Sequence, residues 1–140
     1  MRRGAPRLLA AGLLLCLASG AAASPEVDYM LQCQGCHLAD GSGTPGVVPP
    51  LAGSVGRFLR VPGGREYLVR VPGSSNSQLD DAALAAVLNW ILERFAAEEV
   101  AGGFRPFTEE EVARVRRPPL TDVEAVRERL LRQLGLRAGD

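Results

Sequence analysis

The sequence predicts an all-α fold. Within the 140-residue chain, apolar residues recur at spacings of three and four over residues 84–95 and over residues 123–134, the period of an amphipathic helix. Two Thr-x-x-Glu patterns, which begin at Thr108 and Thr121, are typical of helix N-termini. No segment shows a strong strand pattern. Together these observations predict a small helical domain followed by two further helices.

Residues 1–23 have the organisation of an export signal peptide. Three arginines precede an apolar segment at 8–18, which is too short to span a bilayer comfortably, and the small residues 21–23 form a cleavage site. We expect the mature chain to begin at Ser24 and to have no membrane span. An uncleaved membrane anchor is the alternative.

The mature chain is acidic and has the length of one domain. The full chain has 140 residues, with 16 basic and 16 acidic side chains. Removal of the 23-residue signal peptide, which contains three arginines, leaves 117 residues with 13 basic and 16 acidic side chains. The formal charge of the mature chain is then −3. This charge argues against a nucleic-acid-binding protein. A chain of this length supports a single core. We divide the mature chain into a helical domain at 24–95 and a helical extension at 96–140.

A first helix is expected to begin at residues 24–25, because a serine followed by proline suits a helix start. Three apolar residues then fall at helical spacing: Val27, Met30 and Leu31. We expect their shared face to be buried in the core.

Residues 33–37 read Cys-Gln-Gly-Cys-His, which is the C-x-x-C-H attachment signature of c-type haem. In this chemistry Cys33 and Cys36 form thioether bonds with the two haem vinyl groups, and His37 offers a ring nitrogen to the iron. A zinc site is poorly supported, because the mature chain has no third cysteine and no second histidine. A redox dithiol is expected within a βαβ pattern, and none is found. One covalent haem c, with His37 as the metal ligand, is therefore predicted, and an exported protein of this kind fits the bacterial periplasm.

The segment after the motif predicts loops around one short helix. Residues 39–46 are rich in Gly, Ser, Thr and Pro, and residues 47–53 continue in extended form, since residues before proline avoid the α region. A short helix is expected at 65–71, closed by Pro72 and Gly73, and residues 74–77 are expected to form a polar loop.

The best-defined helix is expected after Asp80, a plausible N-cap, with Leu79 and Leu84 placed to form a hydrophobic staple. Its apolar stripe consists of Leu84, Val87, Leu88, Ile91 and Phe95.

In the extension, Phe107 and Val112 are placed to form a second staple, and the prolines at 118–119 separate the two helices. The second helix carries an apolar stripe made of Val123, Val126, Leu130, Leu131 and Leu134. We expect this stripe to cover the chain's own core, and docking on a partner protein is the alternative. The arginines at 114, 116 and 117 suit either a solvated face or a patch for an acidic partner.

Residues 25–95 resemble a bacterial class I monohaem cytochrome c. Besides the motif, residues 49–53 read Pro-Pro-Leu-Ala-Gly and are similar to the P-x-L-x-G segment of that family. The resemblance implies that the Pro49 carbonyl accepts a hydrogen bond from the other ring nitrogen of His37 and that Leu51 touches the haem. It also implies that residues 65–71 cover the distal flank of the haem and that Tyr29 packs against Trp90.

The chain departs from this family at the second axial ligand. The family supplies a methionine from the loop before the last core helix, but here residues 71–78 contain none. The mature chain has no lysine, and its one methionine, Met30, is expected to pack in the core. We therefore expect a five-coordinate or water-ligated iron. Asn76, Tyr67, a backbone group or a partner's side chain remain alternatives.

The resemblance implies a periplasmic electron carrier that accepts electrons from a dehydrogenase and passes them to another cytochrome or an oxidase. Such a protein is not an enzyme. One alternative is a haem protein that binds a gas or peroxide at an open iron, with weak peroxidase activity. The absence of a distal histidine counts against efficient peroxidase chemistry. A fixed haem subunit of a larger dehydrogenase complex is the other alternative.

Overall fold

The computed structural model describes residues 23–137, and this part of the chain contains helices and no β-strand element. In chain order the elements are α1 (Pro25–Gln32), α2 (Gln34–His37), the 3-10 helix η1 (Val55–Arg60), α3 (Gly64–Arg70), α4 (Pro72–Ser75), α5 (Asp81–Phe95), α6 (Glu109–Val115) and α7 (Val123–Gln133). The all-α prediction is confirmed. Except for Ala23, the predicted signal peptide lies outside the described residues. Within 23–137, no helix is both long and apolar enough to cross a bilayer.

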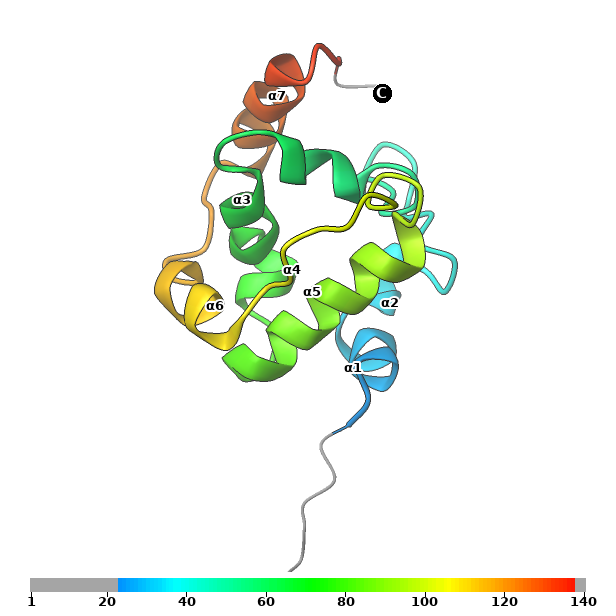
Figure 1. The fold of residues 1–140 in the computed structure, drawn as a ribbon, viewed down its shortest axis with the longest axis vertical. Coiled ribbons are helices and arrows are strands. Elements are labelled where there is room, and N and C mark those ends of the chain that lie inside the picture. The colour runs from blue at the N-terminus through cyan, green and yellow to red at the C-terminus, as the bar shows by residue number, and fades with distance from the viewer. Residues whose placement is uncertain (1–22, 138–140) are drawn as a thin grey trace, which may run out of the picture.

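The longest helix, α5, runs through the middle of the molecule, and α1 packs across it (Figure 1). Asp80 caps α5 as predicted, because its Oδ1 accepts a hydrogen bond from the Ala83 amide at 2.8 Å. All five residues of the predicted apolar stripe are buried. At the crossing, the Tyr29 ring lies 5.1 Å from the Trp90 ring and 5.3 Å from the Phe95 ring. The contact between Tyr29 and Trp90 that the resemblance implies is therefore present.

The prediction for the buried face of α1 is wrong. Val27, Met30 and Leu31 are 41%, 54% and 71% exposed. The buried residues of this helix are Asp28 and Tyr29. An eight-residue helix can bury only one face, and the large Tyr29 ring gains more from contact with α5 than the three aliphatic side chains would. Met30 consequently lies outside the core.

The segment before α5 also differs from its prediction. Residues 72–75 form the helical turn α4, with Pro72 in its first turn, whereas the sequence predicts a loop over residues 74–77. Proline ends α3 because it cannot continue that helix, yet its fixed φ favours the start of a new turn. Ser75 in this turn is completely buried.

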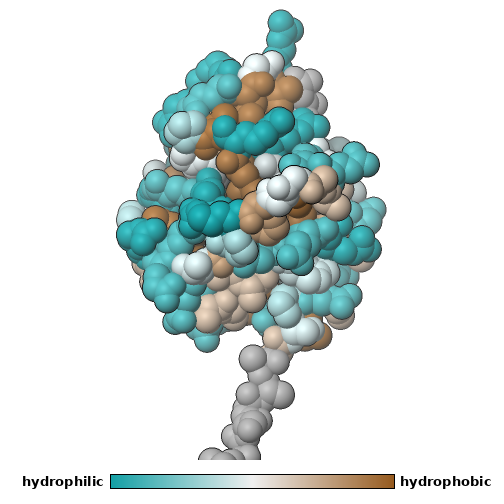
Figure 2. All heavy atoms as spheres, in the orientation of Figure 1, coloured by the Kyte–Doolittle hydropathy of each residue, from teal (hydrophilic) through white to brown (hydrophobic). Residues whose placement is uncertain are grey.

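The C-terminal extension packs on the rest of the chain. Helix α6 contacts α5 and α3, and α7 contacts α3. One cluster of buried side chains contains Phe107, Val112, Leu130 and Leu131 together with the residues of α3 and α5. In the view of Figure 2 the surface is largely hydrophilic, and its apolar residues form a narrow band toward the end that α7 occupies. The extension therefore contributes to the core of its own chain.

The two predicted capping boxes have different outcomes. Thr108 caps α6 by accepting a hydrogen bond from the Glu111 amide at 3.2 Å. At α7 the cap is Asp122, whose Oδ1 accepts from the Ala125 amide at 3.0 Å, so Thr121 was the wrong choice. Aspartate caps a helix at least as well as threonine does, and the sequence pattern alone does not separate neighbouring caps.

The Glu111 side chain does not complete the capping box with Thr108. It binds two arginines outside α6 instead. Arg65 donates two hydrogen bonds of 2.7 Å to this carboxylate, and Arg105 donates two of 2.9 and 3.1 Å. The Arg65 guanidinium also lies 3.9 Å from the centre of the Phe107 ring. Nearby, the backbone of Phe107 exchanges two hydrogen bonds with the Asn89 side chain, of 2.7 and 3.0 Å.

The stability of the folded chain should fall in acid because of Glu111. Hydrogen bonds from Arg65, and then from Arg105, lower the pKa of this carboxyl from 4.5 to about 2. A lowered pKa stabilises the folded state above the unfolded pKa, so this contribution should decrease as the pH falls from 4.5 toward 2. Denaturant unfolding should therefore show Glu111→Gln to be less stable than wild type at pH 7, with the difference shrinking in acid.

The exposed Glu93 on α5 supplies the control for this experiment. Its variant Glu93→Gln should match wild type at every pH. A difference between wild type and Glu111→Gln that is the same at pH 7 and pH 3 would contradict the assignment.

Candidate haem-attachment site

The C-x-x-C-H motif forms a single helical turn directly after α1. Cys33 closes α1 through a 2.9 Å bond from its amide to the Tyr29 carbonyl, and its own carbonyl accepts from the amides of Cys36 and His37 at 3.1 and 3.0 Å. Cys33 is half-buried and Cys36 is exposed, and neither forms a disulfide. The turn therefore presents two free thiols and one imidazole within five residues.

Tyr29 holds the end of this turn. Its hydroxyl donates to the Leu38 carbonyl at 2.6 Å and makes a longer contact of 3.4 Å with the His37 carbonyl. Burial, and then the neighbouring Cys33 and Asp40, raise the pKa of Tyr29 to about 12, so the hydroxyl stays a donor. The sequence analysis assigned only ring packing to this residue. The presence of tyrosine and not phenylalanine at this position could have indicated a hydrogen-bonding role for the hydroxyl.

The loop after the motif folds back over it. The Gly41 carbonyl accepts hydrogen bonds from the amides of Leu51 and Ala52, at 2.7 and 3.2 Å. Gly43 has a φ of 71°, and a Cβ atom there would collide with the backbone carbonyl of Val48. Glycine is therefore required for the close approach of the two arms of this loop. Leu51 is partly buried and packs against the main core.

This arrangement places the Pro49 carbonyl near the imidazole of His37. Burial lowers the pKa of His37, and the interaction with Pro49 offsets part of this effect. The buried Nδ1 atom nevertheless has no partner with hydrogen-bond geometry, so Pro49 approaches it without completing the bond that the resemblance implies. The lowered pKa favours the neutral imidazole, which is the form that binds metals.

Several apolar side chains are exposed on the segment of chain that carries the motif. Among residues 23–137, the exposed large hydrophobic side chains all belong to the segment 27–47: Val27, Met30, Leu31, Leu38 and Val47. No arginine or lysine occurs between residues 24 and 56. Among residues 23–137, no group of three His, Cys, Asp or Glu side chains could hold a bare metal ion. Two free thiols, a neutral imidazole and an apolar surround fit a covalently attached haem better than a bare ion.

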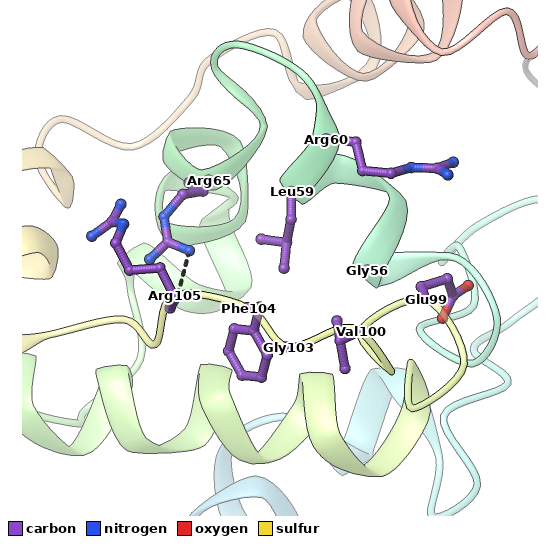
Figure 3. A pocket seen from close by; sticks show the side chains of 9 residues that line it. All are labelled: Gly56, Leu59, Arg60, Arg65, Glu99, Val100, Gly103, Phe104 and Arg105. Atoms are coloured by element: carbon purple, nitrogen blue, oxygen red, sulfur yellow. Dashed lines mark hydrogen bonds between the residues drawn. The ribbon is translucent and has the colours of Figure 1, made fainter.

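A separate hollow of about 310 Å³ lies between η1, the start of α3 and residues 99–105. Figure 3 shows Leu59 pointing from η1 toward the 99–105 segment, whereas the Phe104 ring points away from it toward α5; Arg65 and Glu99 lie at opposite ends. No motif residue lines this hollow. Arg65 at its edge is bound to Glu111.

Two curated relatives cover most of this chain. One cytochrome c-552 of Thermus thermophilus is 40% identical, over 93% of this chain and 95% of the relative. A second cytochrome c-552 of Thermus thermophilus is 41% identical, over 76% of this chain and 93% of the relative. No protein-family model matches the chain. The chain belongs to the cytochrome c-552 family. It is therefore a class I c-type cytochrome with covalently bound haem c, and the predicted cofactor is confirmed.

In this cytochrome, the segment expected to supply a distal methionine lies beside the motif. The Gln78 amide donates a 3.2 Å hydrogen bond to the Gln32 side chain, and Gln32 precedes Cys33. Asn76 is exposed, and its Oδ1 accepts a 3.2 Å bond from Arg117. Gln32 and Arg117 thus both bind this segment.

The phenol of Tyr67 is kept neutral in this cytochrome. Its ring is buried and lies 5.0 Å from the Phe58 ring. Burial raises the pKa of Tyr67, and the nearby Arg127 opposes this effect only in part. The phenolate, the form in which tyrosine would ligate iron, is therefore disfavoured.

Removing the Tyr29 hydroxyl should loosen the motif turn. Tyr29→Phe keeps the ring packing but deletes the donor to the Leu38 carbonyl, so we expect a loss of about 1 kcal/mol in the free energy of unfolding. Hydrogen exchange at residues 37–43 should also become faster. Tyr67→Phe is the matched control, because its ring packs on Phe58 and not on the motif. Equal exchange at residues 37–43 in the two variants would exclude this role of Tyr29.

Proposed function

We propose that this chain is a periplasmic monohaem electron carrier in which Cys33 and Cys36 hold the haem and His37 binds its iron. The observation that carries the proposal is the single helical turn that joins two free thiols to a half-buried imidazole whose pKa is lowered. The export signal predicted at residues 1–23 supports the periplasmic location.

The bound haem would supply reversible one-electron chemistry. Within the chain, Tyr29 fixes the end of the attachment turn, and burial lowers the pKa of His37, which favours the unprotonated imidazole. The apolar side chains around the site would reduce the contact of the haem with water. This favours the oxidation state of the haem that has the lower net charge. No side chain has to transfer a proton or form a bond with a substrate in this function.

A periplasmic dehydrogenase is the proposed electron donor, and another cytochrome or an oxidase is the proposed acceptor. The exposed apolar side chains near the motif, which no positive charge interrupts between residues 24 and 56, suit a weak and transient docking surface. The interpretation as a fixed subunit is less well supported. It requires the apolar stripe of α7 as a docking element, and Leu130 of that stripe is buried in the chain's own core.

The second candidate function is binding of a small ligand, a gas or peroxide, at an open coordination position. The specific support is that two residues that could ligate the iron are engaged otherwise. The Asn76 side chain is bound to Arg117, and burial disfavours the phenolate form of Tyr67. Met30 lies exposed on α1, which precedes the attachment turn. Peroxidase activity should be weak, since the one histidine is already assigned to the iron.

Covalent attachment should depend on both cysteines. Cys33→Ala and Cys36→Ala should each leave a single thioether bond, and the double variant should retain no haem after acid extraction. Mass spectrometry of the protein exported in a host that attaches haem c measures this directly. A double variant that still carried covalent haem would exclude the assignment of these two residues.

The optical spectrum should identify the coordination of the iron. We expect a high-spin ferrous state that binds CO readily and a ferric state that small donors reduce quickly. A low-spin spectrum unaffected by CO would reveal a strong sixth ligand and would leave simple electron transfer as the function. Peroxide consumption above a free-haem control would favour the second candidate.

A further inference from the structure

Arg116 is a buried cation at the end of α6 that binds the chain between α4 and α5. The residue is only 7% exposed. Its Nε donates to the Ser75 carbonyl at 3.1 Å, and its Nη1 to the Leu79 carbonyl and the Asp81 carboxylate at 2.8 and 2.9 Å. Its Nη2 donates to the Ser77 carbonyl and hydroxyl at 2.9 and 3.1 Å. Each of the three guanidinium nitrogens is thus engaged.

The contact is reciprocal. The Ser75 hydroxyl donates to the Arg116 carbonyl at 2.7 Å, inside the core. The sequence analysis grouped Arg116 with Arg114 and Arg117 as a solvated face or a partner patch, and for Arg116 both expectations are wrong. The reason is that segment 75–81 contains three backbone carbonyls that need donors, and one planar guanidinium reaches all of them.

The segment that Arg116 holds borders the attachment turn. Its Gln78 amide binds Gln32, the residue before Cys33, and its Asn76 side chain binds Arg117. Segment 75–81 therefore lies between the C-terminal extension on one side and the end of α1 on the other. Its position depends on both contacts.

We propose that Arg116 is a positioning residue that fixes segment 75–81 beside the haem and so restricts access to the open iron face. This inference rests on the proposed function, because it requires haem at Cys33 and Cys36. Three of the five hydrogen bonds go to backbone carbonyls, so shortening or neutralising the side chain leaves buried acceptors without donors. The segment then becomes free to move away from α1, and a bulky iron ligand gains room.

The test compares Arg116→Gln with Arg114→Gln in the haem-loaded protein. Arg114 is exposed on the same helix and serves as the matched control. We expect imidazole to bind the ferric Arg116→Gln protein roughly tenfold faster than wild type, the size of effect typical of losing a charge-assisted hydrogen bond. Hydrogen exchange should rise in residues 75–81 and stay unchanged in α1. The Arg114→Gln protein should match wild type in both measurements.

Two results would overturn the proposal: an unchanged imidazole rate in Arg116→Gln, or an exchange increase spread evenly over the whole chain. If Arg116→Gln does not fold, Ser77→Ala removes one acceptor of Arg116, together with the hydroxyl's own bond to the Ser74 carbonyl, and should give a smaller change of the same sign. No change in Ser77→Ala would then count against the proposal. A wild-type protein without covalent haem would refute the proposed function, whereas the exchange experiment would still test the hold of Arg116 on segment 75–81.

Discussion

The crossing of α1 and α5 at Tyr29 determines where the attachment turn lies. Once the Tyr29 ring packs between Trp90 and Phe95, the rotation of α1 about its axis is fixed. That rotation fixes the direction in which the chain enters Cys33, and the Tyr29 hydroxyl then holds the far end of the same turn. One side chain thus supports the motif from both sides. This is also why the aliphatic residues of α1 remain exposed around the motif.

The extension is part of the structure that surrounds this crossing. Its Phe107 and Val112 are buried with α5, and the Arg65–Glu111 pair joins α3 to α6 across 46 residues of sequence. The extension predicted at residues 96–140 shares one cluster of buried side chains with the preceding residues. A small haem domain has apolar surface that a few additional helices can cover, and here the added helices belong to the same chain.

The sequence was sufficient wherever a local pattern decides the structure. The Asp80 cap and the buried stripe of α5 depend on neighbouring residues, and their predictions agree with the structure. The face of α1 was mispredicted because helical spacing groups residues without stating which group faces inward. Arg116 was missed because its acceptors lie 35 to 41 positions away along the chain. Whether an arginine is buried there depends on unpaired carbonyls that no local pattern reveals.

The distance along the chain between the motif and Arg116 has a consequence for the order of maturation. The motif lies at residues 33–37, whereas Arg116 follows about 80 residues later. Contacts between residues so far apart form late in folding, after local helices. Under the proposed export from the N-terminus, the two thiols would emerge while segment 75–81 and the extension are still unfolded. The cofactor can thus be joined to an accessible peptide, and the last helices close the structure afterwards.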